Sequence, residues 1–407
     1  MGDVSIVRVC DGDVEHAVRQ AVGLVNGLAV IKPGDTVLVK PNLVKPSQSG
    51  SGIITDARVT EAAAKLALEC GAGKVIIGEG SSVGYDLPGQ VDSLTAMETS
   101  GTADVARLLG LEMIDLNHDE VVPVEAPDAY VMHSFGIART AYEANVIIDL
   151  PVIKTHSRTG ITCGLKNMKG VLPGKEKKRT HRLGLDRGIV DLNRVVKPQL
   201  TVVDAITGRA GTHTRDVDRI ALNCVLAGTD VVAVDAVCAT LMGFRLEDVL
   251  HVRLAAEAGL GEANLDRIEV CREQIAAIAR PFQPYAVAAR ERFGDAVIIE
   301  KNTCTGCWGE MESAFLYLNR AGFADRLKEL ALVMGTPDEV PDLDSVPVIV
   351  GKCPRDHRHL GIWVGGCPPH GLKITDAICE ALGIDKEEVH RTIERLHTAD
   401  SRQAAVP

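Results

Sequence analysis

The chain has 407 residues, of which 46% are hydrophobic and 24% charged, the composition of an ordinary globular protein with two or three domains. Its net charge of −11 and its 3% of aromatic residues argue against nonspecific nucleic-acid binding. It has no apolar run long enough to span a membrane, and its start, MGDVSIVRVCDGD, lacks a signal-peptide core, so we expect no membrane partner. Its 11 cysteines are scattered apart from one pair, which favours a reducing cytoplasm over a disulfide scaffold.

Short apolar runs alternate with amphipathic stretches over residues 4–228. Val/Ile-rich runs of strand length between helices are typical of a parallel sheet that is covered on both faces. The sequence therefore predicts an α/β domain with a layered, mostly parallel sheet, followed by a smaller C-terminal α/β domain. The expected strands cover residues 4–9, 35–40, 74–80, 111–116, 145–151, 200–206 and 224–228, and the first expected helices cover about residues 13–28 and 56–70.

Polar residues follow several of these strands. In parallel α/β sheets, ligand sites gather at the carboxyl ends of the strands. Lys40 and Asn42 end one strand and are candidate substrate-binding residues, although a plain turn explains them equally well. Glu79 and Asp204 end two others, where each is either a base or a turn residue.

The segment 151–182, PVIKTHSRTGITCGLKNMKGVLPGKEKKRTHR, carries nine Lys and Arg residues against one acid, Glu176. Lysines, histidines and backbone amides together form sites for phosphate or carboxylate, and the glycines of the segment allow close approach of the backbone. We predict an anion-binding loop in which Lys154, Asn167 and Lys169 contact a phosphate- or carboxylate-bearing small molecule. The alternative is a solvated, mobile loop, above all for the KEKKR part.

Three residues of this loop are the candidates for catalysis. His156 or His181 is the expected proton donor, because imidazole titrates near neutral pH. Lys166 is expected to act on the ligand directly.

The rest of the chain divides by composition. Residues 230–262 predict two helices, and residues 281–295 predict a helical linker after a first domain over 1–280. A cysteine-bearing domain is expected over 296–398, followed by a frayed tail over 399–407.

Four cysteines of the last domain stand in Gly- and Pro-rich settings: Cys304 and Cys307 in NTCTGCWG, Cys353 in GKCP and Cys367 in GGCPP. Such backbones let several thiolates turn toward one centre, either zinc or an iron–sulfur cluster. One tight pair followed by two widely spaced cysteines favours a [4Fe–4S] cluster over zinc. Buried thiols or a disulfide pair are the remaining alternative.

The order CTGC, GKC and VGGCPP resembles the cluster-binding motifs of the nickel–iron hydrogenase small subunit and its respiratory complex I relative. The resemblance covers about the last quarter of the chain, with shorter spacers. It implies that the four cysteines bind one [4Fe–4S] cluster.

The earlier part of the chain resembles the DUF362 family. The resemblance rests on VKPNLV, TDARVTEAAAKLALECGAGKVIIGEG, LPVIKTH, TGITCGLKNMKGVLPG, LTVVDAI and DVVAVDAV, which span about residues 4–262. A more distant similarity to the nickel-pincer lactate racemase family places counterparts at Lys166 and His181. That family's Gly-x-His-Arg is replaced here by Gly-Glu-Gly-Ser at 78–81.

These observations predict a cytoplasmic [4Fe–4S] redox protein that exchanges electrons between an anionic small molecule and a redox partner protein. The first alternative is an enzyme similar to racemases or isomerases with a structural cluster. The second is an electron carrier or metallocentre-assembly factor without a substrate. Transfer within one chain and transfer across a homodimer both stay open.

Overall fold

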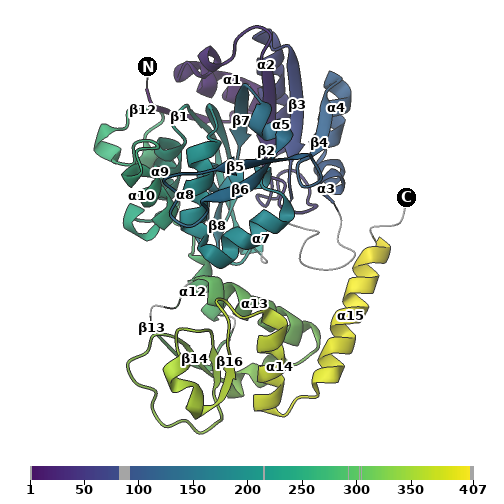
Figure 1. The fold of residues 1–407 in the computed structure, drawn as a ribbon, viewed down its shortest axis with the longest axis vertical. Helices are drawn as coiled ribbons and strands as arrows, with labels where there is room; N and C mark the ends of the chain where they lie inside the picture. Colours follow the sequence, from purple (N-terminus) through teal and green to yellow (C-terminus); the bar gives the residue numbers. More distant parts are fainter. Residues whose placement is uncertain are drawn as a thin grey trace. The chain divides into compact units, whose positions relative to one another are not determined.

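The computed structural model describes residues 2–81, 92–213, 216–291, 293–301, 303 and 305–403. Within these residues the chain forms two compact units (Figure 1). The first comprises residues up to Thr155 and Ile161–Phe282, and the second comprises His156–Gly160 and the chain from Gln283 onward. In the described part of the chain no helix is both long and apolar enough to cross a membrane.

A ten-stranded sheet forms the centre of the first unit, with the order β12-β1-β11-β10-β7-β2-β3-β4; β8 pairs with β10, and β9 pairs with β8. The pairs along β10-β7-β2-β3-β4 are parallel, whereas β11 runs antiparallel to both of its neighbours. The predicted α/β class with a mostly parallel sheet is confirmed. The strands are β1 (Val4–Arg8), β2 (Thr36–Pro41), β3 (Lys74–Glu79), β4 (Glu112–Asp115), β7 (Val146–Leu150), β8 (Val152–His156), β9 (Gly160–Thr162), β10 (Leu200–Arg209), β11 (Arg219–Gly228) and β12 (Val270–Arg272).

Helices cover both faces of this sheet, and a two-stranded hairpin joins one layer. Asp13, Asp56 and Asp230 cap the N-termini of α1, α2 and α9 through side-chain oxygens that accept backbone N–H groups. The elements are α1 (Val14–Leu24), α2 (Ala57–Glu69), α3 (Ser93–Ser100), α4 (Thr102–Leu109), α5 (Arg139–Glu143), α6 (Gly164–Asn167), α7 (Gly174–Leu183), α8 (Leu185–Val195), α9 (Val231–Leu241), α10 (Leu250–Glu257), α11 (Ile275–Ile278), and the hairpin of β5 (Val121–Glu125) and β6 (Ser134–Ala138).

Alternate strand residues build the two layers of the core. On β10, Val202 packs in the cluster formed with α1 and α2, whereas Val203 packs in the cluster formed with α9. Successive side chains of a strand point to opposite faces, so a run such as LTVV supplies both layers at once. Figure 1 shows α1 on one side of the sheet and α8, α9 and α10 on the other.

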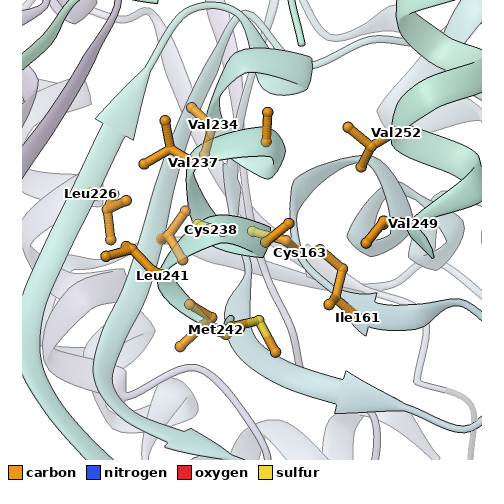
Figure 2. Close-up of a cluster of buried hydrophobic side chains, with 14 of the residues drawn as sticks. Ile161, Cys163, Leu226, Val234, Val237, Cys238, Leu241, Met242, Val249 and Val252 are labelled. Atoms are coloured by element: carbon orange, nitrogen blue, oxygen red, sulfur yellow. The ribbon is translucent and has the colours of Figure 1, made fainter. Parts of the chain in front are cut away.

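Two cysteines belong to the second of these layers. Figure 2 shows Cys163 and Cys238 among Ile161, Leu241 and Met242. Both thiols are fully buried, and burial raises the pKa of Cys163 well above its ordinary value. Cys163 lies inside the basic segment of the sequence, and its position in the core is that of a small hydrophobic residue.

The second unit is a smaller α/β layer. Its four strands are all parallel, in the order β13-β14-β15-β16. Buried residues such as Trp308, Leu332 and Ile378 join the sheet to its helices. The elements are α12 (Tyr285–Glu291), β13 (Val297–Lys301), α13 (Thr305–Arg320), β14 (Ala331–Gly335), β15 (Val348–Val350), the 3₁₀ helix η7 (Arg355–Leu360), β16 (Ile362–Val364), α14 (Gly371–Leu382) and α15 (Lys386–Gln403).

Candidate functional site

A buried ion pair lies at the carboxyl ends of β2 and β3 in the first unit. Lys40 Nζ donates to Glu79 Oε2 at 3.0 Å, and the two side chains are 0% and 4% exposed. Glu79 also accepts the backbone N–H groups of Leu43, at 3.3 Å, and Gly80, at 2.7 Å. These added hydrogen bonds compensate the carboxylate for its loss of water. The sequence left Glu79 open as a base or a turn residue, and the structure makes it the counter-ion of Lys40.

Gly170 closes over this pair from the 3₁₀ turn η2 (Met168–Val171). A Cβ atom on Gly170 would lie 1.9 Å from Glu79 Oε1 and 2.6 Å from Lys40 Nζ. Any side chain here would have to displace the ends of the Glu79 and Lys40 side chains, so the glycine brings the backbone of the basic segment directly against the pair.

An amide network joins the ion pair to three other predicted residues. Lys154 Nζ donates to Asn42 Oδ1 at 2.8 Å, and Asn42 Nδ2 donates to Asn167 Oδ1 at 2.7 Å. Asn167 Nδ2 in turn donates to Asp149 Oδ1 at 2.7 Å. Asp149 is the register neighbour of Lys40 on the adjacent parallel strand β7. The structure thus gathers Lys40, Asn42, Lys154 and Asn167 at one edge of the sheet.

Burial shifts the pKa values of the charged side chains at this edge of the sheet. It lowers the pKa of Lys154 well below its ordinary value, with a further contribution from the charges of Lys166 and Lys45. It also lowers the pKa of Lys166 to about 8, and it raises the pKa of Asp149. An amine with a pKa of about 8, such as that of Lys166, can hold an anion as a cation or accept a proton as a base near neutral pH.

Lys166 projects from the short helix α6, which is fixed by a carboxylate of α9. Asp235 Oδ1 accepts the N–H of Gly164 at 2.7 Å, and Asp235 Oδ2 accepts the N–H of Leu165 at 3.1 Å. These bonds satisfy two backbone donors at the start of α6 and set the direction in which the helix leaves β9. Lys166 itself is partly exposed and has no side-chain hydrogen bond within the described residues.

Three other predicted residues have contacts outside this network. Lys169 Nζ and His181 Nε2 are 2.9 Å apart and form a contact of their own. His156 belongs to the second unit, where its Nδ1 accepts the N–H groups of Arg158 and Thr159. The segment 151–182 is also no single loop: β8, β9, α6, η2 and α7 occupy most of it. Its charged side chains therefore belong to several elements.

Lys177 is a member of the site that the sequence did not indicate. Its side chain is buried, and its Nζ donates to the carbonyl of Gly80 at 2.5 Å and to the amide oxygen of Asn117. Burial lowers its pKa to about 7. Lys175, on the same helix, is exposed. Lys177 can be distinguished from the exposed lysines near it only when the position of each residue on helix α7 is known.

This burial predicts a pH-dependent stability. Lys177 has a pKa of about 7 when folded and about 10.5 when unfolded, so the unfolded chain holds an extra proton between these values. Its contribution to the free energy of unfolding should be fully present above pH 10.5 and should be lost as the pH falls to about 7. Lys177→Met should therefore flatten the rise of stability with pH, measured by urea unfolding. Lys175→Met should keep the wild-type slope; a wild-type slope in Lys177→Met would contradict the assignment.

The cysteines of the second unit follow the strands of the small parallel sheet. Cys353 follows β15, Cys367 follows β16, and Cys307 lies in the first turn of α13, which follows β13. Cys304 lies outside the described residues. Because the carboxyl ends of parallel strands share one edge of a sheet, the three described cysteines stand at the same edge.

Gly351 lies where these segments meet. A Cβ atom built on it would be 3.2 Å from Cys307 Sγ, 3.9 Å from the carbonyl oxygen of Gly366 and 3.9 Å from the ring of Pro354. The last two residues are the chain neighbours of Cys367 and Cys353. Gly351 also has a φ of +102°, which side-chain-bearing residues rarely adopt. One glycine therefore has all three cysteine-bearing segments around it.

The thiols themselves differ in exposure. Cys307 is buried, whereas Cys353 and Cys367 are exposed. Among the residues that the structure describes, no three His, Cys, Asp or Glu side chains stand together as a metal-binding group. The segments converge, but the described thiols are not arranged as a ligand set.

Residues 37–240 match a family described as "Domain of unknown function (DUF362)". The chain belongs to the DUF362 family. The resemblance seen in the sequence is thereby confirmed. The matched range contains the site from Lys40 to Lys177 and ends before Cys304, so the iron–sulfur assignment stays a prediction.

Two further comparisons found proteins that are similar to this chain. A thylakoid-associated protein of Synechocystis sp. (strain PCC 6803) is 28% identical over 237 residues, which cover 57% of this chain and 70% of the relative. The solved lactate racemase apoprotein from Thermoanaerobacterium thermosaccharolyticum has a TM-score of 0.39 and 11% identity, over 60% of this chain and 57% of that chain. This chain thus spans less than two thirds of the length of that structure.

Proposed function

We propose that this DUF362 protein is an iron–sulfur redox protein, with one [4Fe–4S] cluster on Cys304, Cys307, Cys353 and Cys367. The main support for this proposal is the position of Gly351, which lies next to the chain segments of Cys307, Cys353 and Cys367. Thiolates on Gly- and Pro-rich turns are the usual ligands of such clusters. When bound, the cluster would supply one-electron transfer. A reducing cytoplasm, which we propose as the location, keeps such thiols available.

The first unit is proposed to bind the anionic small molecule that exchanges these electrons. Lys154 and Lys166 lie at the carboxyl edge of the sheet, with Lys40 and Asn167 in the same network. Buried or half-buried ammonium groups favour phosphate or carboxylate ligands. His181, next to Lys169, is the candidate proton donor within this unit. The cluster would also need a redox partner protein as its electron donor or acceptor.

Anaerobic purification tests the cluster. We expect about four iron and four sulfide per chain, a broad visible absorption, and an EPR signal after reduction with dithionite. Stoichiometric zinc without iron would reject the redox proposal, because zinc has no redox chemistry in proteins. Iron without any stabilising anion would instead favour an electron carrier with no substrate.

A further inference from the structure

The turn over 156–160 belongs to the second unit, although the chain before and after it belongs to the first. His156 shapes this turn. Its Nδ1 accepts the backbone N–H of Arg158, at 3.1 Å, and that of Thr159, at 3.3 Å. The Thr159 hydroxyl lies 3.1 Å from the same nitrogen. His156, the proton donor expected from the sequence, thus holds the turn that carries Ser157 and Arg158.

Two contacts join this turn to α13. A Cβ atom on Gly309 would lie 2.9 Å from the Cβ atom of Ser157, so the glycine lets the turn approach the helix closely. Arg158 Nη2 donates to Glu310 Oε1 at 3.2 Å, and these two side chains are 20% and 25% exposed. The turn therefore packs against the part of α13 that directly follows Cys307, a predicted cluster ligand.

The second carboxylate oxygen of Glu310 contacts the start of α14. Glu310 Oε2 accepts the N–H of Gly371 at 2.9 Å. This N–H is one of the first four of the helix, which have no partner within the helix itself. A Cβ atom on Gly371 would lie 2.9 Å from the Cβ atom of Ser313 and 3.3 Å from the carbonyl oxygen of Glu310. The start of α14 is thus held directly against α13.

A stiff connection links Gly371 to Cys367. The residues between them are Pro-Pro-His, and each proline ring fixes its own φ. The position of Gly371 therefore sets that of Cys367 more closely than a flexible loop would. At the other end, Cys307 and Glu310 share the first turns of one helix, α13. The Glu310 carboxylate thus connects the segments of two predicted cluster ligands.

We propose that Glu310 and Arg158 are positioning residues for the cluster ligands Cys307 and Cys367. Glu310 holds the two cysteine segments together, and Arg158, on the turn that His156 shapes, holds the Glu310 carboxylate. Replacing residues that orient metal ligands commonly changes metal affinity by about 10–100-fold. The proposal rests on the cluster of the proposed function and assigns to it residues other than the four cysteines.

The rate at which the reconstituted full chain releases iron to an excess of chelator, without oxygen, tests this role. Arg158→Gln and Glu310→Gln should each release iron about tenfold faster than the wild type. The double variant should be no faster than the worse single variant, because the two side chains act through one contact. Glu310→Leu should be faster still, since glutamine keeps an oxygen for the N–H of Gly371 and leucine does not. Arg158→Lys, which keeps a cation, should restore most of the wild-type rate.

Arg326→Gln is the matched control in the same unit. Arg326 pairs with Glu329 in the 3₁₀ helix η6 (Ala324–Glu329), which precedes β14, whereas the cysteines follow the carboxyl ends of the strands. This variant should keep the wild-type rate. The reduction potential of the cluster should shift in Glu310→Gln and stay unchanged in Arg326→Gln, because hydrogen bonds and solvent exposure at the sulfur atoms set it. A change in folding stability alone would not move the potential.

The outcomes separate this inference from the cluster itself. Wild-type rates and potentials in Arg158→Gln and Glu310→Gln would overturn the positioning role and leave the cluster intact. Equally fast release from Arg326→Gln would also overturn it, because general destabilisation of the unit would then be the cause. A wild-type chain that binds no iron would reject the cluster and this inference together. Arg158 is partly exposed on a turn, so Arg158→Gln should fold even where Glu310→Leu does not.

Discussion

Replacing Cys307, Cys353 or Cys367 by serine is expected to remove the iron and the visible absorption from this DUF362 protein. The segments of these cysteines surround Gly351 at one edge of the small sheet, so each would supply one of four thiolates. A serine hydroxyl is a far weaker ligand for iron than a thiolate. Iron should fall from about four per chain to near zero after anaerobic reconstitution. Circular dichroism should show that the first unit stays folded.

Two other cysteines provide matched controls. Cys10 is exposed in the first unit, and Cys163 is buried in its core, so Cys10→Ser and Cys163→Ser should both keep the iron of the wild type. Iron lost in Cys163→Ser would show that the first unit supplies a ligand. Iron kept in all three serine variants of the second unit would reject the proposed ligand set.

The strands of the large sheet could be predicted because each is a buried run of Val and Ile residues. Their directions could not. The run at 224–228 has the same composition as its neighbours, yet it ends β11, which is antiparallel to β1 and β10. Apolar periodicity reports which faces are buried and carries no information on direction. Only the connections between the strands fix it.

The candidate site could be predicted where a polar residue ends a buried strand. Lys40 lies near the end of β2, Asn42 directly follows that strand, and Lys154 lies in β8, so topology alone brings them to one edge of the sheet. Lys177 and Gly170 could not be found in this way. The helix sequence GKEKKRTHRL is polar throughout, and which of its lysines is buried depends on how α7 packs.

Closeness in sequence does not show which compact unit a residue belongs to. His156 is only two residues from Lys154, yet the chain passes from one compact unit to the other between them. A charge-rich segment alone therefore does not show which of its residues share one anion site. That depends on which helix or strand carries each residue and where that element ends.

Glu79→Gln is expected to destabilise the protein by about 3–5 kcal/mol, because it leaves the ammonium of Lys40 buried without a counter-ion. The two side chains are 0% and 4% exposed, so water cannot replace the lost partner. Gly170 closes the space above them. Urea unfolding at neutral pH measures the loss, and the double variant Lys40→Met with Glu79→Gln should recover much of it.

An exposed pair in the same sheet shows why burial decides this result. Lys74 and Glu112 are 2.7 Å apart across β3 and β4, with side chains that are 53% and 47% exposed. Glu112→Gln should change the free energy of unfolding by about 1 kcal/mol or less, because water solvates the remaining lysine. Equal losses from Glu79→Gln and Glu112→Gln would contradict a buried pair at the site. A double variant less stable than Glu79→Gln alone would mean that Lys40 stabilises the fold through its hydrogen bonds even without its carboxylate.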